Sequence, residues 1–353
     1  MTRQVMTRQM MIGGVPLGGG APVSVQSMTN TDTRDVEATS AQIAALAKAG
    51  CDIVRVSVYD QECVRAVRAL VDASPVPLVA DVHFDHRLAI GAVERGIAKL
   101  RINPGNIGGR ANVEKLADCV KAHRIPVRIG VNSGSVEKEM LRKHGGPTPQ
   151  AMLESALAHA KMLEDCGVAD IVLSMKASNV RGTVEAYRLA AARCDYPLHL
   201  GVTEAGLPGQ GTVKSAIGIG ALLLDGIGDT LRVSLTGDPL PEPRVGVDIL
   251  RAVGLRDDHV ELISCPTCGR ARIDVAGIAH RVQEAVGDLP LKLTVAVMGC
   301  VVNGPGEARE ADLGIAGGDG AGALFVKGRV PRKVEGDLAQ ALIEEIRKLA
   351  VES

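Results

Sequence analysis

Three cysteines in the C-terminal part of the chain have the spacing of a metal-binding module. Cys265 and Cys268 form a Cys-x-x-Cys pair within SCPTCGR, and Cys300 stands in MGCVVNGPGE. Thiolates are soft ligands that bind zinc or iron–sulfur clusters. Both segments follow predicted strands and are rich in Gly and Pro, so their backbone N–H groups are free to approach the sulfur atoms of a cluster. The pattern favours an iron–sulfur cluster on these three cysteines.

Two other interpretations of the cysteines compete with this one. A zinc knuckle needs four ligands, usually a second Cys-x-x-Cys pair or two histidines, and His280 stands inside a helical pattern. A thioredoxin-type redox pair begins a helix in a βαβ unit, which this pair does not. The remaining cysteines stand singly and are interpreted as small core residues: Cys51, Cys63, Cys119, Cys166 and Cys194.

A cluster held by three cysteines leaves one iron that needs a further ligand. Glu307 follows Cys300 in the same Gly/Pro-rich segment and is the nearest hard donor. A carboxylate binds such an iron more weakly than a thiolate does. We therefore expect an exchangeable fourth ligand, so that this iron acts as a Lewis acid and redox centre in contact with substrate.

Polar side chains gather at the ends of predicted strands in the first 255 residues. Six of them are cations: Arg55, Lys99, Arg101, Arg128, Lys176 and Arg232. Cations that converge on one site repel each other unless an anion compensates, and guanidinium groups match phosphate oxygens in pairs. This set predicts a site for a diphosphate-sized anion. The carboxylates Asp81 and Glu204 are then interpreted as catalytic groups rather than as charge balance.

The elements that position these residues alternate with a period of about thirty residues, the size of one βα unit. Eight strands with eight crossovers predict an α/β fold, a (β/α)8 TIM barrel over residues 1–255, with its active site at the carboxyl ends of the strands. An open dinucleotide-binding sheet is excluded because PLGGG precedes the first strand instead of following it. The predicted strands are Val23–Ser27, Ile53–Ser57, Leu78–Val82, Lys99–Ile102, Val127–Val131, Ile171–Met175, Leu198–Val202 and Thr230–Ser234.

After Gly254 the pattern changes to a charged linker, Leu255–His259, and then to a smaller α/β domain over residues 256–353. We expect one strand to enter SCPTCGR and another, Lys292–Val297, to enter the segment with Cys300. Helices are predicted near Asp274–Val286 and over Glu335–Ala350. A Gly-rich stretch at 314–322 precedes a further predicted strand at 323–327.

The composition is that of a globular protein, with 46% apolar residues, 23% charged residues and a formal net charge of −1. This balance argues against nucleic acid or a membrane surface as a partner. The opening MTRQVMTRQMMIGG lacks the apolar core of a signal peptide, and no uncharged apolar stretch approaches the length of a membrane span. We therefore expect a cytoplasmic protein with reduced cysteines.

Taken together, these residues resemble the family of 4-hydroxy-3-methylbut-2-enyl diphosphate synthases in its two-domain bacterial form. The resemblance runs from about Val23 to the end of the chain. The segments that carry it are VQSMTNTDT, DIVRVSV, ADVHF, KLRINPGN, VRIGVNSGS, LSMKASN, HLGVTEAG, LRVSLTGDP, SCPTCGR and MGCVVNGPGEAR.

The resemblance implies reductive ring opening of 2-C-methyl-D-erythritol 2,4-cyclodiphosphate to 4-hydroxy-3-methylbut-2-enyl diphosphate, with loss of water, in non-mevalonate isoprenoid synthesis. Flavodoxin or ferredoxin is expected to supply two electrons. The enzyme is expected to be a homodimer with composite sites, in which the barrel of one subunit meets the cluster module of the other.

The resemblance also implies roles for individual residues. It places one 4Fe–4S cluster per chain on Cys265, Cys268, Cys300 and Glu307. It places the diphosphate on Arg55, Arg101, Arg128, Lys176, Arg232 and Ser234. It places Asp81, Asn132 and Glu204 near the ring and the leaving hydroxyl, where we expect Glu204 to assist proton delivery.

Two other classes of protein share parts of this pattern. A barrel enzyme with a structural zinc, such as a pterin-dependent transferase, also carries Asn and Arg at its strand ends. An iron–sulfur sensor without catalytic activity keeps the cysteines but needs no cationic barrel. Metal content and visible absorption distinguish the three classes.

Overall fold

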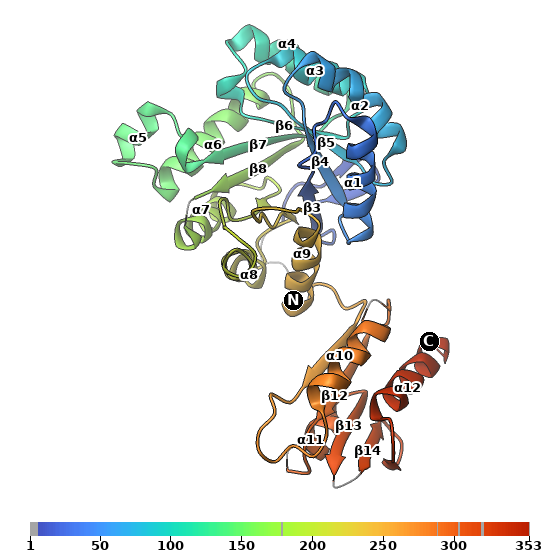
Figure 1. Ribbon diagram of the computed structural model, residues 1–353. Coiled ribbons are helices and arrows are strands. Elements are labelled where there is room, and N and C mark those ends of the chain that lie inside the picture. The colour runs from blue at the N-terminus through green and yellow to red at the C-terminus, as the bar shows by residue number, and fades with distance from the viewer. Residues whose placement is uncertain (1–5, 178, 288, 303, 319–320, 353) are drawn as a thin grey trace. The chain divides into compact units, whose positions relative to one another are not determined.

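A computed structural model describes residues 6–177, 179–287, 289–302, 304–318 and 321–352 (Figure 1). The chain divides into two compact units, residues 1–255 and 256–353. The predicted charged linker spans this boundary. No helix in these described ranges is long and apolar enough to cross a membrane.

The first unit is an eight-stranded parallel barrel, which confirms the predicted fold class. Its strands follow the order β8-β7-β6-β5-β4-β3-β10-β9, and a parallel bridge between Leu173 and Leu198 brings the two ends of the sheet together. The strands are β3 (Ser24–Met28), β4 (Ile53–Ser57), β5 (Leu78–Asp81), β6 (Lys99–Ile102), β7 (Val127–Asn132), β8 (Ile171–Lys176), β9 (His199–Leu200) and β10 (Thr230–Leu231).

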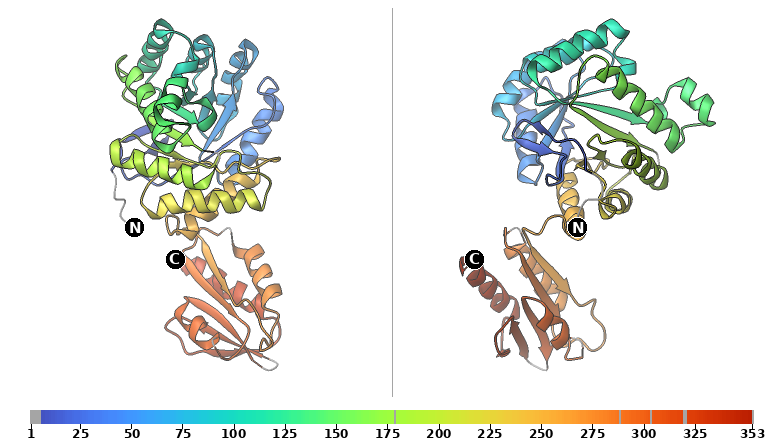
Figure 2. Two further views of the ribbon diagram at one scale, coloured as in Figure 1. Left: turned by 90° about the vertical axis from the view of Figure 1, so that its left-hand side faces the viewer. Right: turned by 180° about the vertical axis from the view of Figure 1, so that it is seen from behind.

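Helices surround the strands on the outside (Figure 1, Figure 2). Several begin at a side-chain cap, for example α2, where Asp60 accepts a hydrogen bond from the backbone N–H of Cys63 (2.8 Å). The helices are α1 (Val36–Lys48), α2 (Gln61–Ala73), α3 (His86–Glu94), α4 (Arg110–His123), α5 (Lys138–His144), α6 (Pro149–Glu164), α7 (Val180–Arg193), α8 (Gln210–Leu224) and α9 (Pro241–Ala252). Short 3₁₀ turns, η1 (Pro104–Asn106) and η2 (Ser133–Ser135), follow β6 and β7.

Successive side chains of a strand point to opposite faces. The outer face is apolar, whereas the polarity of the inner face changes along the barrel. In β4, Val54 and Val56 belong to the core beneath the helices, whereas Ile53 and Arg55 are the intervening residues. Ile53 packs in an apolar cluster, and Arg55, two residues later, lines a polar cavity. The interior is therefore apolar where the strands begin and charged where they end.

A small antiparallel hairpin packs against the apolar end of the interior. It consists of β1 (Met10–Ile12) and β2 (Val15–Leu17), and its segment is dark blue in Figure 2. The sequence analysis did not predict it, because three-residue strands are too short to show an alternating pattern. The buried residues of this cluster are Met10, Ile12, Leu17, Ile53, Val79 and Val172.

The last two barrel strands are shorter than predicted. β9 and β10 each span two residues, although the sequence predicted five. The N–H of Arg232 still bonds to the carbonyl of Leu200 (2.9 Å). Beyond these residues the two segments are no longer paired as strands. The residues that were assigned to strand ends here, Thr203 and Ser234, lie instead on loops at the rim.

The second unit is a five-stranded mixed sheet in the order β11-β12-β13-β14-β15. The first three strands are parallel and the last two run antiparallel to their neighbours. Its elements are β11 (Val260–Ser264), α10 (Val275–Val286), β12 (Leu293–Met298), α11 (Gly304–Glu310), β13 (Leu313–Gly318), β14 (Ala321–Val326), β15 (Arg332–Val334) and α12 (Leu338–Glu352).

Helices cover both faces of this sheet. Val295 and Val297 of β12 share a core with residues of α10 and α12, whereas Ala296 and Met298 pack with Ala308 of α11. The Gly-rich stretch at 314–322, which the sequence analysis left without a strand, contributes to β13 and β14. A Cβ on Gly314 would lie 2.8 Å from the Ala308 backbone, so glycine here permits α11 to pack directly on the sheet.

Candidate functional site

A polar cavity of about 450 Å³ opens at the carboxyl ends of the barrel strands. Seven of the eight strands or the loops that follow them contribute to it. Its lining residues are Arg55, Asp81, Arg101, Arg128, Gly130, Asn132, Ser174, Lys176, Thr203, Arg232 and Ser234. Five cations and a single carboxylate face this space, so the cavity carries an excess of positive charge.

The structure brings together eight of the nine barrel residues that the sequence singled out as site residues. The exception is Glu204, which follows the lining residue Thr203 but is itself exposed, with a backbone φ of +54°. Ser174 and Thr203 line the cavity without having been chosen. Ser174 stands two residues before Lys176 in β8, a spacing that indicates the same inward direction, whereas Thr203 lies on the loop after β9.

Asp81 is the carboxylate between the cations. Its side chain contacts Arg101 Nη1 (2.9 Å), Arg55 Nε (3.5 Å) and His83 Nε2 (3.3 Å). Burial opposes ionisation of this group, but attraction to Arg55, a hydrogen bond with His83 and attraction to Arg101 outweigh it and hold the pKa of Asp81 well below its usual range. Asp81 thus balances the charge of Arg55 and Arg101, whereas the sequence analysis interpreted it as a catalytic group rather than as charge balance.

Burial and mutual repulsion destabilise the charged forms of the cavity cations. Burial, followed by the neighbouring arginines Arg232 and Arg101, lowers the pKa of Arg55 to about 9 despite the attraction of Asp81. Burial and nearby guanidinium groups also lower the pKa of Arg128 and of Lys176 well below their usual values. An anion in the cavity would relieve this cost, so the site is built to bind one.

A second polar layer lies beneath the cavity. Lys99, which the sequence grouped with Arg101, is fully buried there and donates to Gln26 Oε1 (3.1 Å). His199 is also fully buried, and burial lowers its pKa well below the usual value. Asn103, directly after β6, accepts a hydrogen bond from the N–H of Gly105 (3.1 Å) in the turn that follows the strand.

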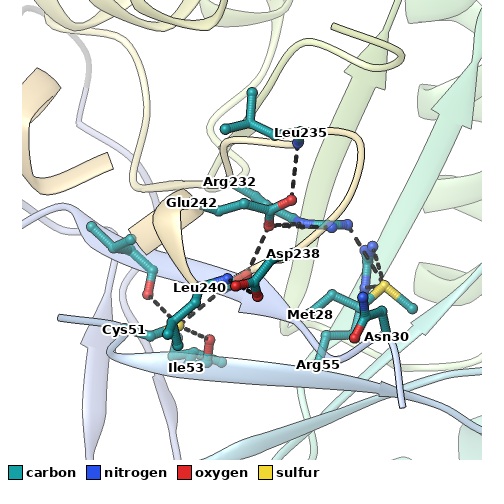
Figure 3. A network of polar contacts seen from close by, with 12 residues as sticks. Met28, Asn30, Cys51, Ile53, Arg55, Arg232, Leu235, Asp238, Leu240 and Glu242 are labelled. Carbon is teal, nitrogen blue, oxygen red and sulfur yellow. Dashed lines mark hydrogen bonds and ion pairs between the residues drawn. The ribbon is translucent and has the colours of Figure 1, made fainter. Parts of the chain in front are cut away.

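A thioether separates two of the cavity arginines. Met28 Sδ accepts from Arg55 Nε (3.1 Å) and Nη2 (2.9 Å), and Arg232 Nη1 approaches it at 3.6 Å (Figure 3). The sequence analysis did not single out Met28, since a methionine at a strand end is ordinarily a core residue. Sulfur is a weak acceptor, so these donors remain available for a stronger one.

The proposed cluster ligands lie at the carboxyl ends of two neighbouring strands in the second unit. Cys265 directly follows β11 and donates its N–H to the carbonyl of Val297 in β12 (3.0 Å), and Cys300 follows β12. Cys265 and Cys300 are half-buried, whereas Cys268 is exposed. Glu307 is exposed and lies on α11, so the predicted Gly/Pro loop is a short helix at this position.

These residues fit an iron–sulfur cluster in donor type and in connectivity. Backbone and side-chain hydrogen bonds with Arg270 lower the pKa of the Cys268 thiol, which favours the thiolate that binds metal. In the ranges that the structure describes, no three His, Cys, Asp or Glu side chains are already gathered as a metal site. Cys265 and Cys300 therefore belong to segments that follow two neighbouring strands of one sheet.

Comparison with known proteins assigns both units to one family. The GcpE TIM-barrel domain matches residues 7–247, and the GcpE protein C-terminal domain matches residues 261–348. The chain belongs to the GcpE family. This membership confirms the resemblance drawn from the sequence motifs.

Curated GcpE relatives align over nearly the whole chain. A 4-hydroxy-3-methylbut-2-en-1-yl diphosphate synthase (flavodoxin) of Geobacter sulfurreducens is 57% identical over 347 residues, covering 98% of both chains. The protein of the same name from Clostridium perfringens is 56% identical over 344 residues, covering 97% of this chain and 99% of its own.

Among solved structures, the GcpE barrel is similar to that of the Yersinia pestis dihydropteroate synthase. The TM-score is 0.51 at 14% sequence identity, covering 70% of this chain and 97% of the other. At this identity the similarity concerns the fold alone.

Proposed function

We propose that this chain catalyses the reductive ring opening of 2-C-methyl-D-erythritol 2,4-cyclodiphosphate to 4-hydroxy-3-methylbut-2-enyl diphosphate. Two electrons and one proton enter, one carbon–oxygen bond to the diphosphate opens, and one hydroxyl leaves as water. The observation that carries the proposal is the cationic cavity at the barrel rim, in a chain that aligns end to end with synthases of this name.

In this proposal the barrel binds and orients the diphosphate. Arg55, Arg101, Arg128, Lys176 and Arg232 provide the positive charge, and Ser234 provides a hydroxyl. Ring opening leaves an additional negative charge on the diphosphate, and fixed cations in a buried site stabilise that charge as it develops. Asp81 keeps Arg55 and Arg101 in place while no anion is bound.

Asn132 and Glu204 are proposed to act on the organic part of the substrate. Asn132 lines the cavity at the end of β7, and we propose that its amide orients a substrate hydroxyl. Glu204 is exposed beside the lining residue Thr203. We propose that it delivers the proton that accompanies the leaving hydroxyl.

Cys265, Cys268, Cys300 and Glu307 are proposed to hold one 4Fe–4S cluster per chain. When bound, this cluster supplies the electrons, which a flavodoxin or a ferredoxin delivers one at a time. The support is the donor set: three thiols and one carboxylate lie in the segments that follow β11 and β12. Each unit contains half of the required chemistry, and we propose that a homodimer combines the barrel of one subunit with the cluster module of the other.

Anaerobic purification of the full chain tests this proposal. The protein should be brown, with roughly four iron and four sulfide per chain. Given chemically reduced flavodoxin and the cyclodiphosphate, it should form the linear diphosphate, which phosphorus NMR detects directly. A colourless zinc protein, or a brown protein that leaves the cyclodiphosphate unchanged, would contradict the proposal.

A further inference from the structure

A buried carboxylate that does not line the cavity contacts one of its cations from behind. Glu242 lies in the first turn of α9 and its side chain is only 2% exposed. Its Oε2 forms an ion pair with Nε and Nη2 of Arg232, at 3.4 Å from each (Figure 3). The same oxygen accepts from Ser27 Oγ (2.8 Å), and Oε1 accepts from the N–H of Leu235 (2.9 Å).

These contacts fix the carboxylate to three separate segments. Ser27 belongs to β3, Arg232 directly follows β10, and Leu235 lies further along the loop that leads to α9. β3 and β10 are neighbours in the barrel sheet. Both oxygens of Glu242 therefore have defined donors, and its position is determined by the fold rather than by a ligand.

The two edges of the Arg232 guanidinium face different partners. Nε and Nη2 contact Glu242, whereas Nη1 contacts the sulfur of Met28, at 3.6 Å. A carboxylate is a strong acceptor and a thioether a weak one. The edge held by Glu242 is thus fixed, and the other edge retains a donor for an anion in the cavity that Arg232 lines.

Glu242 also balances the positive charge of Arg232. Arg232 is 15% exposed and shares the cavity with four other cations. Asp81 pairs with Arg55 and Arg101, whereas Arg232 pairs with Glu242. Without Glu242, Arg232 would be repelled from Arg55 and Lys176 and would lose its preferred orientation.

We infer that Glu242 is a positioning residue for the anion site: it orients the Arg232 guanidinium toward the bound diphosphate without touching the substrate. This inference rests on the proposed function, which makes the anion a diphosphate. It adds a second carboxylate to the site, behind the cations, where a first-turn acidic residue would ordinarily be read as a favourable partner of the helix dipole.

The test measures binding of inorganic pyrophosphate to the full-length protein by titration calorimetry. Glu242→Gln should weaken binding about tenfold, because an amide offers oxygen at only one of the two positions and carries no charge. Arg232→Gln should weaken it at least as much. The double variant should bind no more weakly than Arg232→Gln alone, since Glu242 acts through Arg232.

Two further variants keep the test decisive. Glu242→Asp retains the charge but withdraws it from Arg232, and it should lose affinity about threefold, again only when Arg232 is present. Asp229→Asn is the matched control. Asp229 is a buried barrel carboxylate that accepts from the N–H of Leu198 (2.8 Å) and from Thr7 Oγ (2.7 Å), next to the amino end of β10. This variant should lower thermal stability while leaving pyrophosphate affinity unchanged.

The outcomes separate the two proposals. Wild-type affinity in Glu242→Gln, or losses that add in the double variant, would overturn the positioning role. Wild-type affinity in Arg232→Gln would instead remove Arg232 from the proposed diphosphate site, and with it a part of the proposed function.

Discussion

The barrel cavity and the cluster ligands represent two ways of building a site. In the barrel, the cavity cations lie at or near the ends of strands and are largely buried, and Asp81 is paired with Arg101 (2.9 Å). In the second unit, Cys268 and Glu307 are exposed. The barrel site is thus lined by buried side chains, whereas two of the proposed cluster ligands lie on the surface.

This difference fits the ligand that each site is proposed to hold. A diphosphate would be bound and released in every turnover, so its site must keep its shape without it, and the buried ion pairs of Asp81 supply rigidity. A cluster stays in place, and its bonds to thiolates are strong enough to organise the chain around it. The two sites should therefore fail independently, and in different ways.

The largest effect is expected from Cys300→Ser. Loss of one thiolate should abolish the cluster absorption and essentially all turnover. If the barrel site is complete by itself, the variant should still bind pyrophosphate with wild-type affinity. Iron analysis, visible spectra and titration calorimetry measure these three properties.

The control for this variant is Cys194→Ser. Cys194 is a partly buried thiol at the end of α7, whose Sγ lies 3.2 Å from the carbonyl of Ala190. A serine retains that hydrogen bond, so the cluster and turnover should persist. A Cys300→Ser protein with a full cluster and normal turnover would refute the ligand assignment.

The next largest effects are expected from substitutions of Glu204 and Glu307, which should affect the two sites differently. Glu204→Gln cannot supply a proton, so turnover should fall by about 10²–10⁴ with a normal cluster and near-normal binding. Glu307→Ala should instead make the cluster labile and change its spectrum before any substrate is added. Paramagnetic resonance of the reduced, substrate-free proteins and single-turnover rates provide the comparison. The reverse pattern would show that the two roles are exchanged or wrong.

A smaller effect, on affinity alone, is expected from Arg128→Met. A hydrogen bond to a charged partner contributes about 1.5–3 kcal/mol, so pyrophosphate affinity should fall by about one to two decades. Arg128 is 2% exposed and its pKa is lowered by burial, so the apolar substitute should leave the melting temperature unchanged or raise it. The control Arg65→Met changes an exposed arginine on α2 and should alter neither property. Parallel losses of affinity and stability would argue against a site that is strained until an anion binds.

The smallest effect concerns pH. Burial and neighbouring cations hold the pKa of Lys176 low in the empty site, and a bound anion should raise it. Between these two pKa values, binding takes up a proton, so affinity should fall as pH rises, by at most about tenfold per pH unit. Calorimetry in two buffers of different ionisation enthalpy measures the uptake. Comparison with Lys176→Gln subtracts the titration of pyrophosphate itself, and an unchanged proton count in that variant would exclude Lys176 as the source.

Much of the barrel was predictable because its strands are β-branched runs bounded by turns. β4 and β6 begin and end at the predicted residues. The cavity followed from the same pattern, since parallel strands bring their carboxyl ends to one place. The layer that each cation occupies did not follow: Lys99 lies beneath the cavity and Arg101 lines it, although both are cations of the same strand.

What escaped prediction depends on contacts between distant segments. β13 and β14 are rich in glycine, which is depleted in strands. Close packing explains some of these glycines: a Cβ would meet α11 at Gly314 and the segments with Gly299 and Ile273 at Gly317. Glu242 was overlooked because acidic residues are common in first helical turns, and its ion pair with Arg232 exists only in the folded barrel. The spacing of Cys265, Cys268 and Cys300 indicates their chemistry but not the geometry that a bound metal would impose.

The N-terminal hairpin has a consequence for the order in which the barrel forms during synthesis. Met10, Ile12 and Leu17 leave the ribosome first, but one of their packing partners, Val172, stands in β8. The N–H of Arg8 bonds to the carbonyl of Asp195, which is made later still (2.8 Å). The hairpin therefore completes its packing only after β8 and Asp195 have been translated, although its partners Ile53 and Val79 are made earlier. We expect its docking to be a late event in folding.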